Sequence, residues 1–126
     1  MERLYSRKRR GFTLVEIMIV VLIIGILLAI AVPNFIRARE SARAKSCVAN
    51  LKSINGAKEQ WAMVNKKTAT DTPTVDDLYG VDKFIKTEPS CPSGGSYTLA
   101  AVSTVPSCSI GTNTAGGDAS DDHVLP

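Results

Sequence analysis

The sequence predicts an α+β fold in which a long N-terminal helix, half of it transmembrane, packs on a small antiparallel β-hairpin or sheet head. Three observations predict this fold. Residues 12–32 form an unbroken apolar run, residues 33–66 repeat apolar positions at helical spacing, and residues 67–126 hold turn signals around short strand-like stretches. Because the basic leader and the apolar run take up part of the 126-residue chain and leave less for a water-soluble fold, the core of the head must be small.

Residues 1–11 form a basic leader peptide. They carry a net charge of +4, whereas the whole chain has a formal charge of +3, so about −1 is left for the rest. Binding of nucleic acid needs a basic surface on the folded domain itself. The charge therefore indicates targeting, and we expect no direct nucleic-acid partner.

Residues 12–32 (FTLVEIMIVVLIIGILLAIAV) are long enough to cross a bilayer, since a helix of this length spans about 30 Å. The one ionisable residue in the run is Glu16. An acidic residue at mid-membrane costs about 3 kcal/mol, but the many Leu, Ile, Val and Phe side chains each contribute about 0.3–0.6 kcal/mol in favour of insertion. The segment is predicted to insert with a carboxylate that needs a cation.

The apolar run itself offers Glu16 no cationic partner, because the flanking basic residues are Arg10 and Arg37. Cleavage between Gly11 and Phe12 would create an α-ammonium close to Glu16. In a bundle of such helices, this ammonium could pair with the carboxylate of a neighbouring subunit. The alternative is a tolerated glutamate at the membrane interface.

The segment RRGFTLVE, residues 9–16, resembles the processing site of type IV prepilins and type II secretion pseudopilins. The resemblance implies cleavage after Gly11 by a prepilin peptidase/methyltransferase, N-methylation of Phe12, Glu16 as the assembly residue and a helix kink at Pro33. It also implies a leader in the cytoplasm, a single pass through the bacterial inner membrane, and then a periplasmic or extracellular filament. The implied partners are other pilin or pseudopilin subunits, in a homo- or hetero-filament, and the inner-membrane assembly machinery.

A second interpretation is an ordinary secretory signal, because Ala29-Ile30-Ala31 resembles a cleavage site and would release the chain from Val32 onward. The apolar run is longer than the usual signal core, and an ordinary signal core does not explain the presence of Glu16. A membrane-anchored or secreted binding module outside any filament is thus the alternative function. Pilus or secretion pseudopilus, and major or minor subunit, stay open, although the small head favours a minor pilin or pseudopilin.

Residues 33–66 are predicted to form an amphipathic stalk helix. Its apolar positions recur at three- and four-residue steps: Val48, Leu51, Ile54, Ala57, Trp61 and Val64. The head is the part of the chain that can cover this stripe, so Leu51 and Trp61 should lie in the core. Pro33 lacks an N–H, which predicts a kink near the membrane boundary.

The first part of the head is predicted to be a loop over 65–73 and then a short helix. Residues 74–77 (TVDD) resemble a capping box, and the helix should stop at Gly80. Phe84 and Ile85 are the expected apolar anchors.

The second part is predicted to be a hairpin, with strands over 96–102 and 106–110 and a turn near 103–104. In that hairpin Tyr97 and Leu99 can face the stalk helix.

The three cysteines, Cys47, Cys91 and Cys108, allow one disulfide. Cys91 and Cys108 flank a strand-like stretch and are the nearest pair; closing that loop would stabilise the head by about 3 kcal/mol. The alternative is three reduced, buried thiols. There is no CxxC spacing or Cys/His cluster in the sequence, so we expect no metal site and no cofactor.

The C-terminal residues 111–126 are expected to form a solvated loop that includes His123. Major pseudopilins, which the N-terminal segment resembles, bind calcium in a C-terminal loop, and Asp118, Asp121 and Asp122 have the oxygen ligands that calcium prefers. Their spacing matches no calcium-loop motif, so calcium stays open. Because the sequence has no nucleophile elbow, His/Asp/Ser set or phosphate-cradling glycine motif, we expect no enzyme.

Overall fold

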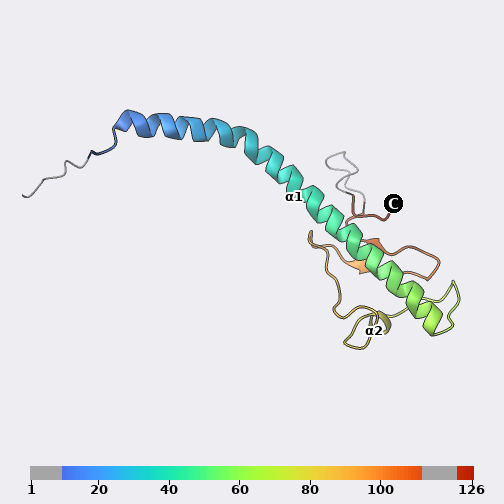
Figure 1. Ribbon diagram of the computed structural model, residues 1–126. Helices are drawn as coiled ribbons and strands as arrows, with labels where there is room; N and C mark the ends of the chain where they lie inside the picture. The colour runs from blue at the N-terminus through green and yellow to red at the C-terminus, as the bar shows by residue number, and fades with distance from the viewer. Residues whose placement is uncertain (1–9, 112–121) are drawn as a thin grey trace, which may run out of the picture. The chain divides into compact units, whose positions relative to one another are not determined.

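The computed structural model describes residues 10–111 and 122–126, and the chain divides into two compact units, one ending at Ile36 and the other beginning at Arg37. Four elements follow in order (Figure 1): α1 (Leu14–Val64), α2 (Val75–Leu78), β1 (Tyr97–Thr98) and β2 (Ser107–Cys108). A long apolar helix followed by a small antiparallel sheet confirms the predicted α+β class. Most of the leader, as well as Asp118 and Asp121, lies outside the described residues.

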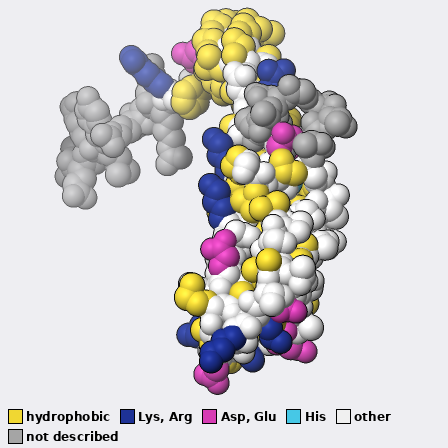
Figure 2. All heavy atoms as spheres, turned by 90° about the vertical axis from the view of Figure 1, so that its right-hand side faces the viewer, with side chains coloured by type: hydrophobic (Ala, Val, Ile, Leu, Met, Phe, Trp, Pro, Cys, Tyr) yellow, Lys and Arg dark blue, Asp and Glu magenta, His cyan; other side chains and the backbone are white. Residues whose placement is uncertain are grey.

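The first unit contains the apolar part of α1, whose large hydrophobic side chains are all exposed. Figure 2 shows hydrophobic side chains gathered over this part of the chain. Within the described residues, α1 is the one helix long and apolar enough to cross a membrane. Such a surface needs lipid or other apolar helices to cover it.

Pro33 lies inside α1, which continues to Val64. A proline has no N–H to donate, so the carbonyl of Ala29 loses its usual helical partner. This is the local weakness on which the predicted kink depends, and the kink itself stays a prediction.

In the second unit one face of α1 is buried against the head: Ala44, Cys47, Leu51, Ile54, Ala57, Lys58 and Trp61. These positions recur every three or four residues, as expected for a helix covered on one side. The prediction that Leu51 and Trp61 are core residues is confirmed. Val64 is 70% exposed, because α1 ends at this residue and the chain then turns through Lys66 in a left-handed conformation.

The core has two parts. The cysteine core consists of Cys47, Leu51, Cys91 and Cys108, and the tryptophan core consists of Ile54, Ala57, Trp61 and Leu78. Tyr97 packs against both cores and Leu99 against the tryptophan core, which confirms that these two side chains face α1. Phe84 and Ile85 also pack on the tryptophan core, as predicted.

The hairpin is antiparallel, with Tyr97 opposite Cys108 and Thr98 opposite Ser107. Its strands are two residues long, so the predicted strands over 96–102 and 106–110 are too long. Ala100, two residues after β1, has φ +56°, outside the extended region, so the strand does not continue to residue 102 as predicted.

Lys58 gives a second reason for the short strands. Its side chain is fully buried, and Nζ donates hydrogen bonds to the carbonyl of Leu99 at 2.6 Å and to that of Thr104 at 2.5 Å. These carbonyls therefore bond to a side chain of α1, and the buried ammonium is satisfied by backbone. The sequence pattern gave no sign of this, because lysine is normally exposed.

The predicted capping box at α2 is confirmed. Asp77 Oδ2 accepts hydrogen bonds from the backbone N–H of Thr74 and from its hydroxyl, both at 2.8 Å. α2 ends at Leu78, and Gly80 follows with φ +151°. The carbonyls of Leu78 and Ile85 then accept from the N–H groups of Ile85 and Gly80, at 2.9 Å each.

Candidate functional site

The processing segment precedes the first turn of α1. Gly11 and Phe12 are exposed and lie before the helix begins at Leu14. A Cβ added at Gly11 would meet no atom within 4 Å, so the glycine is not required there by packing inside the chain. The Gly11–Phe12 peptide bond is therefore open to another protein.

Glu16 forms a capping box with Thr13. Oε2 of Glu16 accepts a hydrogen bond from the backbone N–H of Thr13 at 2.8 Å, and the N–H of Glu16 donates to Oγ1 of Thr13 at 3.3 Å. This reciprocal pair was not among the features predicted from the sequence, although a Thr-x-x-Glu spacing signals it. The consequence is that the carboxylate points back towards the start of α1, where the partial positive charge of the helix dipole lies.

Cleavage after Gly11 would place the α-ammonium of Phe12 one residue before the N–H that Glu16 already accepts. The structure thus brings together the predicted cleavage, methylation and assembly residues around one helix terminus. Pro33, the predicted kink residue, is part of the same helix and is not a neighbour of these three in sequence.

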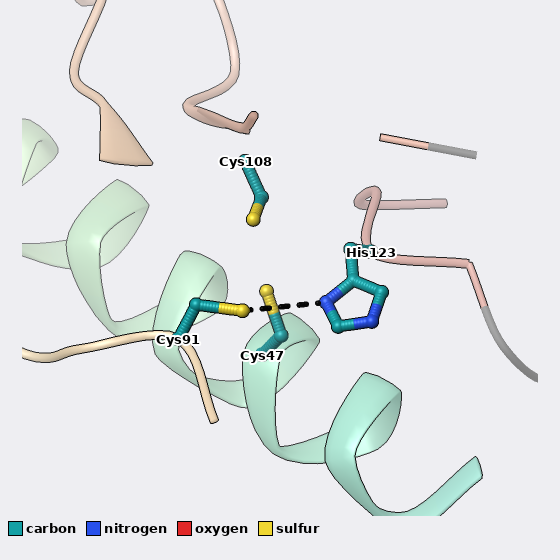
Figure 3. Close-up of side chains that lie close together, drawn as sticks. All are labelled: Cys47, Cys91, Cys108 and His123. Carbon is teal, nitrogen blue, oxygen red and sulfur yellow. Dashed lines mark hydrogen bonds between the residues drawn. The ribbon is translucent and has the colours of Figure 1, made fainter. Parts of the chain in front are cut away.

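A second group of residues lies in the head. Cys47 from α1, Cys91 from the loop before β1, Cys108 from β2 and His123 from the C-terminal segment point towards one another (Figure 3). We call this group the Cys–His cluster. All four side chains are buried, and their sulfur and nitrogen atoms lie within 4.8 Å of one another. Cys91 Sγ lies 3.5 Å from His123 Nδ1.

Local backbone features hold these residues in place. A Cβ at Gly95 would lie 2.6 Å from Cys108 Sγ, so any other residue there would displace the sulfur. The N–H of Gly94 donates to the carbonyl of Cys91 at 3.0 Å, and the N–H of His123 donates to that of Gly111 at 2.9 Å.

The electrostatic environment differs among the thiols. Burial raises the pKa of Cys47 to about 12, against a lowering by a hydrogen bond from the hydroxyl of Tyr97. Burial also raises the pKa of Cys91, but hydrogen bonds from the N–H groups of Ser93 and Gly95, together with those from the thiols of Cys47 and Cys108, outweigh it, and the net pKa of Cys91 is lowered. Of these two thiols, Cys91 is the better stabilised as a thiolate.

At this cluster and in the C-terminal segment, the structure corrects one expectation and leaves two untested. His123 is buried, so the prediction of a solvated histidine is wrong. The Cys–His cluster was not predicted, because its four residues form no recognisable Cys/His pattern in the sequence. All three cysteines are free thiols, and the predicted Cys91–Cys108 disulfide is not shown and stays a prediction. Asp122 is described, but two of the three aspartates considered for calcium are not, so calcium stays untested.

Comparison with known proteins identified relatives of this chain. The family described as "Prokaryotic N-terminal methylation motif" matches residues 6–32. The type II secretion system core protein G of Escherichia coli K12 is 33% identical over 104 residues, which cover 73% of this chain and 72% of that protein. The type IV narrow pilus major component PilA5 of Thermus thermophilus is 34% identical over 107 residues, covering 85% and 84%.

A third relative is similar over a shorter stretch. The type IV major pilin protein PilA of Myxococcus xanthus is 46% identical over 57 residues, which are 45% of this chain and 26% of that protein. No solved structure gave a significant match. Similarity to the first two relatives covers far more of the chain than the 27 residues of the N-terminal motif.

Proposed function

Since this chain belongs to the family of type IV pilins and type II secretion pseudopilins, we propose that it is processed after Gly11, methylated at Phe12, and assembled into a filament through helix packing and pairing of Glu16. Its role is that of a structural filament subunit. The alternative of a binding module outside a filament is not favoured, because the relatives are filament and secretion-system components.

The observation that carries this proposal is the exposed apolar part of α1 with one carboxylate at its start. In the membrane, lipid covers this surface; in a filament, the same surface of neighbouring subunits covers it. Because apolar burial is similar in the two states, hydrophobicity alone does not favour assembly. A charge pair formed only between subunits can then decide both assembly and register.

The Thr13–Glu16 capping box supports a specific sequence of contacts. Before assembly, Glu16 accepts from the N–H of Thr13, so its charge has a partner in its own chain. After cleavage, the ammonium of Phe12 in another subunit is a stronger partner for Glu16 than a neutral N–H. N-methylation leaves that ammonium charged, so the pair survives the modification.

The proposed setting follows from this chemistry. The chain is a membrane-anchored filament protein; we propose the bacterial inner membrane, with the leader in the cytoplasm, before incorporation into a periplasmic or extracellular filament. Its partners are other pilin or pseudopilin subunits, a prepilin peptidase/methyltransferase and the inner-membrane assembly machinery. We propose that the chain has no catalytic activity. We also propose that it is divided by function into a leader (1–11), a membrane helix (12–32), a stalk (33–66) with a kink at Pro33, and a head (67–126).

The test is the N-terminal sequence and intact mass of the chain recovered from membranes and filaments. We expect a chain that starts at methylated Phe12. A start at Val32 would indicate an ordinary secreted protein, and a start at Met1 would indicate an unprocessed anchor; either result would contradict the proposal.

A pair of variants tests the assembly role. Glu16→Ala should leave membrane insertion intact and strongly reduce incorporation into filaments, whereas Glu59→Ala, which changes an exposed glutamate on the stalk part of α1, should incorporate normally. Normal incorporation of the Glu16 variant would refute the pairing, even if processing after Gly11 is correct.

A further inference from the structure

We propose that Cys47, Cys91, Cys108 and His123 form a closed tetrahedral Zn²⁺ site that ties the stalk helix, the hairpin and the C-terminal segment together. The donor set is the first argument. Three sulfurs and one imidazole are among the common ligand sets of structural zinc sites, which are four-coordinate and have no open position. The four residues come from separate segments and converge on one buried point (Figure 3).

The distances agree with this geometry. Zn–S bonds of about 2.3 Å and a Zn–N bond of about 2.0 Å in a tetrahedron place sulfurs about 3.8 Å apart and sulfur and nitrogen about 3.5 Å apart. Cys91 Sγ lies 3.5 Å from His123 Nδ1, and all pairs of ligand atoms lie within 4.8 Å. Shifts of about 1 Å or less, within the reach of side-chain rotation, would complete the site.

The surroundings supply the hydrogen bonds that metal-bound thiolates need. The N–H groups of Ser93 and Gly95 donate to Cys91 Sγ, in a turn that begins at that cysteine. The hydroxyl of Tyr97 interacts with Cys47, and Asn50 Nδ2 in turn donates to Tyr97 at 3.0 Å. Such outer contacts orient ligands and are characteristic of built metal sites.

A single disulfide explains the arrangement less completely. It would use two of the three sulfurs and leave a thiol and an imidazole buried together. A buried imidazole needs polar partners for its ring nitrogens. Nδ1 of His123 contacts the thiol of Cys91, which is a weak hydrogen-bonding group. A metal ion engages all four side chains at once.

The head also has a physical reason to bind a metal ion. Its strands have two residues each, and its core is small. Small domains with little core are often stabilised by a structural metal, whose binding is coupled to folding. On binding, Zn²⁺ replaces the protons of the three thiols, which are released to solvent, and coordinates one neutral imidazole nitrogen.

The first experiment uses the full chain in detergent, purified anaerobically with a phosphine reductant. Native mass spectrometry and elemental analysis should find one Zn²⁺ per chain, and all three thiols should be alkylated only after EDTA treatment. Restoring Zn²⁺ should raise the melting temperature on the order of 10 °C. Co²⁺ in its place should give the visible and near-ultraviolet bands of tetrahedral thiolate coordination.

Variants identify the ligands. His123→Ala and Cys108→Ser should each lower Zn²⁺ affinity by at least about 100-fold, more than is typical for loss of an outer-sphere contact. His123→Cys should retain Zn²⁺ and change the Co²⁺ spectrum. Ser107→Ala is the matched control, because Ser107 precedes Cys108 in β2 and its side chain is exposed; it should bind like the unaltered chain.

Two results would overturn the inference. One is a disulfide and one free thiol in the unaltered chain when cells are quenched in acid and free thiols are blocked before any reductant is added, which would support the predicted Cys91–Cys108 bond or another pairing. The other is a fully reduced chain that binds no Zn²⁺ or binds it equally well in the His123→Ala variant. The thiol count on the unaltered chain decides the question even if a cysteine variant fails to fold.

Discussion

Each half of α1 carries one charged residue in an unusual place, and the two residues differ in what surrounds them. Lys58, in the part that packs on the head, is fully buried and donates to two carbonyls of the same chain. Glu16, in the apolar part, is exposed and accepts from the N–H of Thr13, which directly precedes α1. The stalk half is therefore completed by its own head, whereas the apolar half is completed only by lipid or by other subunits.

This difference separates two kinds of mutational effect. Substitutions on the buried face of the stalk half should change the folding of the head. Substitutions on the apolar half should change membrane insertion or filament assembly and leave the head unchanged.

The largest effect on folding is expected at Leu51, and another leucine of the same helix, Leu22, serves as its control. Leu51 is 0% exposed, whereas Leu22 is 64% exposed. Leu51→Ala should lower the free energy of unfolding of the head by roughly 4 kcal/mol, because it removes buried surface and leaves a cavity. Leu22→Ala should leave it unchanged. Denaturant unfolding of the full chain in detergent, followed by Trp61 fluorescence, measures both; equal effects would contradict the division between the halves.

The next effect concerns the buried ammonium. Lys58→Ala should lower the free energy of unfolding by roughly 3 kcal/mol, since it leaves the carbonyls of Leu99 and Thr104 without their donor in a buried site. Lys52→Ala, on the exposed side of α1, is the control and should have little effect. If Lys58→Ala left the free energy of unfolding unchanged, water would be able to replace the ammonium as the donor to these carbonyls.

A pH series sharpens this result. Burial lowers the pKa of Lys58 from 10.5, so between the folded pKa and 10.5 the unfolded chain binds more protons than the folded chain. Stability attributable to Lys58 therefore rises as pH rises through this window. Relative to Lys58→Met, the unaltered head should gain stability towards pH 10.5. Tyr79 and Tyr97, whose pKa values burial raises, act in the opposite direction in both proteins and cancel in the comparison.

The parts of the fold that depend on local pattern could be predicted from sequence. The apolar run, the helical spacing of Leu51 and Trp61, and the capping box at Thr74 each follow from neighbouring residues. The length of the strands could not, because it depends on Ala100 and on carbonyls that bond to Lys58, more than forty residues away in the sequence.

The same reasoning applies to the candidate sites. Gly11, Phe12 and Glu16 are consecutive or nearly so, and a short motif contains them all. The Cys–His cluster is built from four distant segments, and no spacing rule relates Cys47 to His123. The turn at Cys91, where the N–H of Gly94 donates to the Cys91 carbonyl, surrounds one member of the cluster and does not reveal the other three.

The smallest expected effect tests the capping box of α2, which belongs to the head alone. Hydrogen bonds from the N–H and hydroxyl of Thr74 lower the pKa of Asp77 from 3.8. The stabilisation is thus complete above pH 3.8 and is lost as pH falls through the lower folded pKa. Asp77→Asn should lower the melting temperature slightly at neutral pH, and the difference from the unaltered chain should disappear in acid. Asp76→Asn, one residue earlier and outside the box, is the matched control and should change the melting temperature at neutral pH less than Asp77→Asn does. A difference that persists in strong acid would mean that Asp77 acts through packing and not through its charge.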